Sequence, residues 1–222
     1  MEQLLEYIAY CIEFGKVDQK TPYPPDMKGQ EGADELTRQA LNEGMKAKEI
    51  LDNALFPAMS RVGEKFKANK IFVPQVLMSA KAMNASMAYL KPYFQSGEVT
   101  QKGTFIIGTV AGDLHDIGKN LVSVIVEGSG WNVIDLGTDV KTDQFMEKVK
   151  ENPGAIVGMS ALLTTTMASM EKSVKEIKEQ AHETKIIIGG APVTDKFRSE
   201  IGADYYSLDP DGAVKYLNQL VS

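Results

Sequence analysis

The chain has 222 residues, 43% of them hydrophobic and 24% charged, which is typical of a globular protein with one large domain or two small ones. Its formal net charge of −6, without a block of Lys and Arg, argues against a nucleic-acid partner, and no apolar stretch approaches the roughly 20 residues needed to cross a membrane. Residues 1–14 carry acidic residues where a secretory signal would have basic ones, so we expect a cytoplasmic protein.

Hydrophobic residues recur at helical spacing through the first part of the chain. The pattern predicts four helices, which contain residues 4–12, 36–41, 50–62 and 76–90. Pro74 fits the first turn of the fourth helix, whereas Pro57 lies inside the third pattern and predicts a kink or a break. Cys11, the single cysteine, lies on an apolar helix face and is expected in the core. We therefore expect a four-helix bundle domain over residues 1–94, with an irregular proline-rich connection at 15–32.

A short polar segment, residues 95–102, is expected to be a linker and a hinge, and the hydrophobic pattern changes after it. Residues 103–222 alternate short β-rich runs with amphipathic helical patterns. Strands are expected at 104–110, 131–137, 155–160, 185–190 and 204–208, and helices near 117–129, 141–150, 166–182, 193–200 and 210–220. This alternation predicts an α/β domain with a flavodoxin-like or Rossmann-like, doubly wound, five-stranded parallel sheet.

Polar residues and glycines gather directly after three of the predicted strands, at the edge of the sheet where such folds bind ligands. The three segments are GDLHDIG at 112–118, SALLTTT at 160–166 and GGAPVT at 189–194. Each segment also has a plain structural interpretation: the aspartates and hydroxyls could cap helices, His115 could be a hydrogen-bonded turn residue, and the paired glycines could serve a turn with positive φ. Taken one at a time, none of the three segments decides between a site and an ordinary loop.

Taken together, the segments resemble the cobalamin-binding domains. The pattern D-x-H-x-x-G, S-x-L and G-G, separated by residues 119–159 and 163–188, is matched by Asp113, His115, Gly118, Ser160, Leu162, Gly189 and Gly190. The helical part, with VGEKFKANKIFVPQVLMSAKAM at 62–83, is similar to the four-helix cap of methionine synthase and of the small corrinoid proteins of methylotrophic methanogens and acetogenic bacteria. The resemblance covers nearly the whole chain, although the connection at 15–32 is longer than is usual in the family.

The resemblance implies that cobalamin or a related corrinoid binds with its nucleotide tail in the α/β domain and with His115 as the lower axial ligand of cobalt. Asp113 would hold the other ring nitrogen, Thr166 would complete the hydrogen-bonded relay, and Ser160 would meet the nucleotide base. The three glycines would leave room for the tail and Leu162 would pack against it. Further cofactor-binding residues are expected in the same segments and in the cap: Leu114, Asp116, Ile117, Thr164 and Ala191, with Phe66 and Val73 at the upper face of the ring. Phe66 and Val73 could equally be plain bundle core.

The same resemblance implies a methyl carrier that takes a methyl group onto cobalt from a substrate-specific methyltransferase and gives it to a second methyltransferase that loads a thiol or pterin. A reductive activation protein would be a further partner, and no nucleic acid or membrane is expected. Since no catalytic barrel of about 250 residues is evident, we expect the chain alone to turn nothing over efficiently. The alternatives are a cobalamin-dependent sensor or regulatory protein, which the acidic charge and the lack of a DNA-binding module oppose, a small subunit of an adenosylcobalamin mutase, which the cap opposes, and a cofactor-free flavodoxin-like domain. The methyl donor, the acceptor and the oligomeric state are not specified by these residues.

Overall fold

The computed structural model describes residues 2–221 and divides them into two compact units. The first unit runs to Gln101 and includes Gly128–Gly130, and the second holds Lys102–Glu127 and the residues from Trp131 on. Within the described range, no helix is both long enough and apolar enough to cross a membrane.

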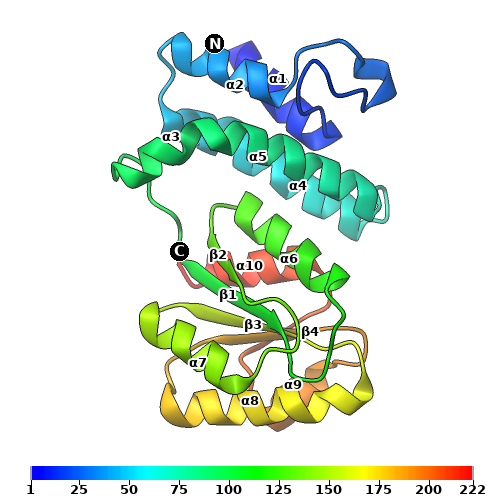
Figure 1. Cartoon of the computed structure of the whole chain (residues 1–222), viewed down its shortest axis with the longest axis vertical. Coiled ribbons are helices and arrows are strands. Elements are labelled where there is room, and N and C mark those ends of the chain that lie inside the picture. The colour runs from blue at the N-terminus through cyan, green and yellow to red at the C-terminus, as the bar shows by residue number, and fades with distance from the viewer. Residues whose placement is uncertain (1, 222) are drawn as a thin grey trace. The chain divides into compact units, whose positions relative to one another are not determined.

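The first unit is a helical bundle (Figure 1). Its elements are α1 (Glu2–Phe14), a 3₁₀ turn η1 (Pro25–Met27), α2 (Ala33–Asn42), α3 (Ala47–Ile50), a π-helical turn η2 (Leu51–Leu55), α4 (Phe56–Lys67) and α5 (Val73–Gln95). The core contains fully buried apolar side chains from α1, η2, α4 and α5, among them Ile8, Leu55, Met59 and Leu90. Cys11 is fully buried, which confirms its predicted place in the core, and this burial raises the pKa of its thiol to about 12.

The prediction for Pro74 is confirmed, whereas the disturbance predicted at Pro57 takes the form of a π-helical turn. Pro74 lies in the first turn of α5, and Pro57 lies in the first turn of α4, directly after the π-helical turn η2. In η2 the Phe56 N–H donates to the carbonyl of Leu51, five residues back. Because Pro57 has no N–H, it cannot continue the ordinary i→i−4 pattern, and the wider turn lets the chain remain helical where the sequence predicted a kink or break.

The second unit is a parallel sheet with helices on both faces, as predicted. Its strands are β1 (Thr104–Thr109), β2 (Asn132–Asp135), β3 (Ile156–Ser160), β4 (Ile186–Gly189) and β5 (Tyr205–Ser207), in the order β2-β1-β3-β4-β5. Its helices are α6 (Ile117–Gly128), α7 (Thr142–Glu151), a 3₁₀ turn η3 (Thr164–Thr166), α8 (Met167–Gln180), α9 (Asp195–Ile201) and α10 (Pro210–Gln219). All neighbouring strands pair in parallel.

Alternate residues of the strands supply two separate cores. Ile106 of β1 packs with side chains of α7, α8 and α9, whereas Phe105 and Ile107 of the same strand pack with α6 and α10. Figure 1 shows these two sets of helices on opposite faces of the sheet. Since both faces are covered, the strands read as continuous apolar runs instead of alternating ones.

Candidate functional site

The strand order reverses at β1, the strand from which the predicted histidine segment departs. β2 lies on one side of β1 and β3 on the other, and Thr109 at the end of β1 pairs with Ser160 at the end of β3. The loops that leave β1 and β3 therefore lie beside each other at the carboxyl edge of the sheet. This is the position at which doubly wound sheets bind ligands.

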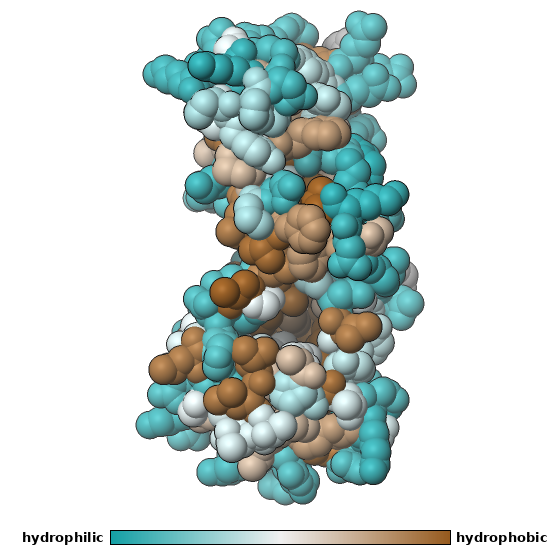
Figure 2. Space-filling view, turned by 90° about the vertical axis from the view of Figure 1, so that its right-hand side faces the viewer, coloured by the Kyte–Doolittle hydropathy of each residue, from teal (hydrophilic) through white to brown (hydrophobic). Residues whose placement is uncertain are grey.

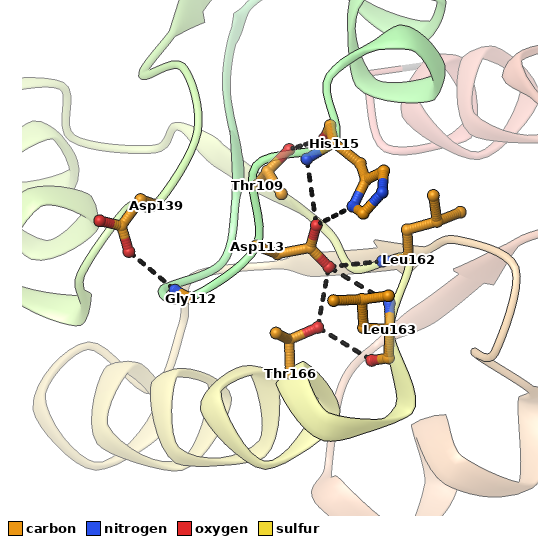
Figure 3. A network of polar contacts seen from close by, with 8 residues as sticks. All are labelled: Thr109, Gly112, Asp113, His115, Asp139, Leu162, Leu163 and Thr166. Carbon is orange, nitrogen blue, oxygen red and sulfur yellow. Dashed lines mark hydrogen bonds and ion pairs between the residues drawn. The ribbon is translucent and has the colours of Figure 1, made fainter.

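Asp113 is the buried centre of this edge (Figure 3). Its Oδ1 accepts hydrogen bonds from the backbone N–H of His115 at 3.1 Å and from His115 Nδ1 at 2.7 Å. Its Oδ2 accepts from the loop after β3: from the N–H groups of Leu162 at 2.7 Å and Leu163 at 3.3 Å and from the Thr166 hydroxyl at 2.8 Å. One buried carboxylate thus joins the histidine to the loop after β3 and to the 3₁₀ turn η3 that precedes α8.

Burial by itself would raise the pKa of Asp113, but the hydrogen bonds from the Leu162 N–H, the His115 ring and backbone, and the Thr166 hydroxyl outweigh it and hold the pKa well below its ordinary value. The carboxylate is therefore ionised at neutral pH and can only accept hydrogen bonds. Because Nδ1 of His115 lies against this acceptor, Nδ1 carries the hydrogen in the neutral ring, and Nε2 keeps its lone pair.

The His115 side chain offers one nitrogen lone pair to a metal, that of Nε2, on a ring that is half exposed. Among residues 2–221 there is no group of three or more His, Cys, Asp and Glu side chains that could hold a metal ion. One imidazole with a carboxylate behind it suits a transition metal that takes its other ligands from a macrocycle.

The backbone of the histidine segment is held from two further residues, which the sequence analysis missed. The buried hydroxyl of Thr109 donates to the His115 carbonyl at 2.8 Å. Asp139, in the loop after β2, accepts from the Gly112 N–H at 2.7 Å, and its own N–H donates to the Asp113 carbonyl at 3.0 Å. The available signal was position alone: Thr109 ends the first strand, and Asp139 follows the second strand at the same edge.

The three glycines predicted to make room for a cofactor tail differ from one another. A Cβ atom on Gly118, in the first turn of α6, would meet no atom within 4 Å, so open space lies beside the histidine segment. A Cβ atom on Gly189 would stand 3.0 Å from the Ser207 carbonyl oxygen. At Gly190 the φ angle is +125°, and a Cβ atom would lie 1.8 Å from the carbonyl oxygen of Ala161, so the backbone itself requires glycine there.

The remaining predicted residues of the α/β unit also lie at the carboxyl edge. Ser160 ends β3 and is partly buried, whereas Thr164, Ala191 and Asp116 are exposed. Several apolar side chains at this edge are exposed as well, namely Leu114, Ile117, Leu162, Leu163 and Leu208. Figure 2 shows brown side chains interrupting the hydrophilic surface in its lower half, which is the α/β unit. Apolar surface gathered around a histidine is the kind that a large, partly apolar ligand covers.

Phe66 and Val73 belong to the first unit. Phe66 lies near the end of α4 and Val73 is the first residue of α5, and both side chains are partly exposed. They are therefore not packed away inside the bundle core, although they flank the buried residues Val62 and Val76.

Comparison with known proteins adds independent findings. Residues 103–214 match a family model described as a B12 binding domain, and residues 29–91 match a second model with the same description. The chain is 38% identical over 224 residues to the dimethylamine corrinoid protein of Methanosarcina barkeri, an alignment that covers 100% of this chain and 99% of that protein.

Two solved structures are similar to nearly the whole length of the chain. A cobalamin-binding protein from Desulfitobacterium hafniense DCB-2 has a TM-score of 0.75 at 29% identity and covers 98% of each chain. A chain of the methanol:cobalamin methyltransferase complex MtaBC from Methanosarcina barkeri has a TM-score of 0.82 at 29% identity, which covers 99% of this chain and 80% of that chain.

Proposed function

Because the chain belongs to the family of corrinoid proteins with B12 binding domains, we propose that it carries a methyl group, on the cobalt of a bound corrinoid, from one methyltransferase to another. The bound cofactor would supply a metal centre that accepts and releases the methyl group. The protein residues would hold that centre, since His115 would donate a nitrogen lone pair to the metal.

The observation that carries the proposal is the Asp113–His115 pair. The buried carboxylate fixes the hydrogen of the imidazole on Nδ1, which leaves Nε2 as a donor directed away from its carboxylate partner. We assign Nε2 of His115 as the protein ligand of cobalt. Thr166 keeps Asp113 in place through its hydroxyl group, since the distance of 2.8 Å to Oδ2 is that of a good hydrogen bond.

Two further features fit a cofactor with a long tail and a broad ring. The open space beside Gly118 is adjacent to the histidine segment, and we propose that the nucleotide tail enters there, with Ser160 and Leu162 along its path. The exposed side chains of Leu114 and Ile117 would offer apolar surface to the ring. Phe66 and Val73 of the first unit are proposed as further contacts of the ring, and residues 95–102 as a hinge.

The partners are inferred from the three steps that a methyl carrier needs, namely receipt of the methyl group, its release and reductive activation of the cofactor. We propose a substrate-specific methyltransferase, an acceptor methyltransferase and a reductive activation protein, all in the cytoplasm. The names of the relatives mention dimethylamine and methanol, so the methyltransferases for these two donors are the first to test.

Reconstitution with hydroxocobalamin tests the proposal, and the two histidines of the chain provide a matched pair of variants. The wild type, produced with nitrogen-15 histidine, should retain the red cofactor through gel filtration, and its Co(II) form should show the two-line splitting of a nitrogen-15 ligand in the electron paramagnetic resonance spectrum, which the unlabelled base of the cofactor cannot give. His115→Ala should lose that splitting, whereas His182→Ala should keep it, because the His182 side chain is 83% exposed and lies outside the site. A His115→Ala spectrum identical to that of the wild type would refute the assignment. The proposal of methyl carriage fails if neither of these donor methyltransferases methylates the reduced, Co(I) form of the bound cofactor.

A further inference from the structure

We propose that Asp139 is a positioning residue for His115: it clamps the backbone of the histidine segment to the loop after β2 and thereby sets the direction of the imidazole. This inference rests on the proposed function, in which His115 is the cobalt ligand. Neither the sequence pattern nor the resemblance assigns a role to Asp139.

The contact is reciprocal and involves the two residues that lead into the histidine. The Asp139 carboxylate oxygen Oδ1 accepts from the Gly112 N–H at 2.7 Å, and the Asp139 N–H donates to the Asp113 carbonyl at 3.0 Å. Figure 3 shows Asp139 on the side of the segment away from Leu162 and Thr166. The loop that carries Asp139 is itself anchored, because the Val140 N–H donates to the Thr109 carbonyl at 2.9 Å.

The backbone conformation of Asp139 indicates that this position requires the carboxylate that bonds to Gly112. Its φ angle is +54°, in the left-handed region that favours glycine, and Gly112 across the contact has a φ angle of +85°. Aspartate tolerates the left-handed region less well than glycine does. At this position the carboxylate supplies what glycine lacks, namely a charged acceptor for the Gly112 N–H.

Asp113 is consequently held at two ends. Its carboxylate is fixed by the loop after β3, through the Leu162 N–H and the Thr166 hydroxyl, and its carbonyl is fixed by Asp139 in the loop after β2. Without the Asp139 contacts, the segment would keep the carboxylate anchor, the Asp113 N–H bond to Val110 and the Thr109 bond to the His115 carbonyl, but Gly112 and the Asp113 carbonyl would lose their partners and the direction of the ring would be set less firmly. A metal–imidazole bond needs the lone pair of Nε2 to point at the metal, so a less firmly set ring weakens ligation.

A measurement on the cofactor-free protein tests the clamp directly. In Asp139→Gly the backbone conformation stays favourable and the N–H to Asp113 remains, so only the carboxylate is lost. We expect amide hydrogen exchange at Gly112 to become about tenfold faster or more, and Asp139→Asn, whose amide oxygen can still accept, to stay close to the wild type. Asn69→Gly is the matched control, because Asn69 has nearly the same φ angle, +53°, in the first unit. Unchanged Gly112 exchange in Asp139→Gly would refute the clamp.

A second measurement tests the effect on ligation. With Co(II) cobalamin bound to protein labelled with nitrogen-15 histidine, Asp139→Gly should show the histidine nitrogen splitting in a smaller fraction of molecules and bind the cofactor on the order of tenfold more weakly, and Asp139→Asn should restore both. Faster Gly112 exchange with an unchanged nitrogen signal would refute the positioning role, and so would failure of Asp139→Asn to restore the signal. A wild type without the nitrogen signal would instead refute His115 as the cobalt ligand, while the Gly112 exchange would still decide whether the clamp exists.

Discussion

Replacement of Asp113 by Asn should invert the hydrogen bonding of His115 while leaving the shape of the buried side chain unchanged. The carboxylate faces donors on both sides: two from His115 on Oδ1, and the Leu162 N–H, Leu163 N–H and Thr166 hydroxyl on Oδ2. An asparagine presents an oxygen to one side and an NH₂ group to the other. In either orientation the NH₂ group of the asparagine faces hydrogen-bond donors of the protein. The two orientations differ in which of these donors lose their acceptor.

With the NH₂ group toward the loop after β3, the backbone N–H groups of Leu162 and Leu163 both lose their acceptor, at about 1–3 kcal/mol each. With the NH₂ group toward His115, one backbone N–H loses its acceptor, and the ring can adapt by accepting at Nδ1. The second orientation is therefore favoured, and we expect the variant to lose about 1–3 kcal/mol of stability. In this orientation the hydrogen of the neutral ring moves to Nε2, so the nitrogen assigned to cobalt has no free lone pair. We expect ligation to weaken by about 10- to 100-fold.

Nitrogen-15 chemical shifts of the histidine rings in the cofactor-free protein report the position of this hydrogen. His115 should change from the Nδ1–H to the Nε2–H form, with the exposed His182 as an internal reference. Asp143→Asn is the control for the lost charge, because Asp143 is exposed in the first turn of α7. An Asp113→Asn protein that keeps the hydrogen on Nδ1, or binds cobalamin within twofold of the wild type, would refute the reasoning.

Three other predictions concern the same edge of the sheet. Thr166→Val removes one donor from a buried carboxylate and should lower the free energy of unfolding by about 1–2 kcal/mol in urea, whereas Thr165→Val, on the exposed neighbour, should change it by less than about 0.5 kcal/mol. Because the pKa of Asp113 is lower in the folded chain than its ordinary value of about 4, its contribution to stability is present above that pH and is lost as the pH falls through the folded-state pKa. The stability difference between the wild type and Asp113→Asn should accordingly shrink between about pH 5 and pH 3, and a constant difference would contradict this. Gly118→Ala should fold with unchanged or higher stability but bind cobalamin more weakly, whereas Gly190→Ala should lose on the order of 3 kcal/mol of stability or more. Thermal unfolding and cofactor titration together show which glycine leaves room for the cofactor tail and which is required by the backbone.

The elements of the fold were predictable because their signals are local. Runs such as TFIIGT are short, β-branched and bounded by turn residues, and the structure places all five of them in the sheet. Pro57 indicated that the third helical pattern would be disturbed. The disturbance is a π-helical turn over Leu51–Leu55, and this form depends on how the bundle accommodates the one extra residue that such a turn contains. The end of the first helical part was less clear, since Val99 in the polar segment is buried.

The site was predictable only in part, for a physical reason. The bond between Asp113 and His115 spans two residues, so the D-x-H string indicates it. The bond from the Leu162 N–H to Asp113 spans 49 residues and exists because β1 and β3 are neighbours, which no local pattern states. Asp139 escaped notice because its role depends on the neighbouring strand β2 and on a left-handed backbone. Gly190 was interpreted as room for a tail, although the carbonyl of Ala161 supplies a sufficient reason for glycine.

The strand order explains why binding of a tail and donation by the imidazole should be coupled. His115 leaves the strand β1, and its support comes from the loops of both neighbours, with Asp139 after β2 and Leu162 after β3. The Leu162 residue has two functions in this arrangement, because its backbone N–H holds Asp113 while its side chain, 42% exposed, is available to a ligand. A tail that packs on this side chain restrains the same loop that fixes the carboxylate, and hence restrains the ring. Cobalamin analogues without the nucleotide tail should therefore show weaker ligation by His115 as well as weaker binding, a loss that a rigid site would not produce.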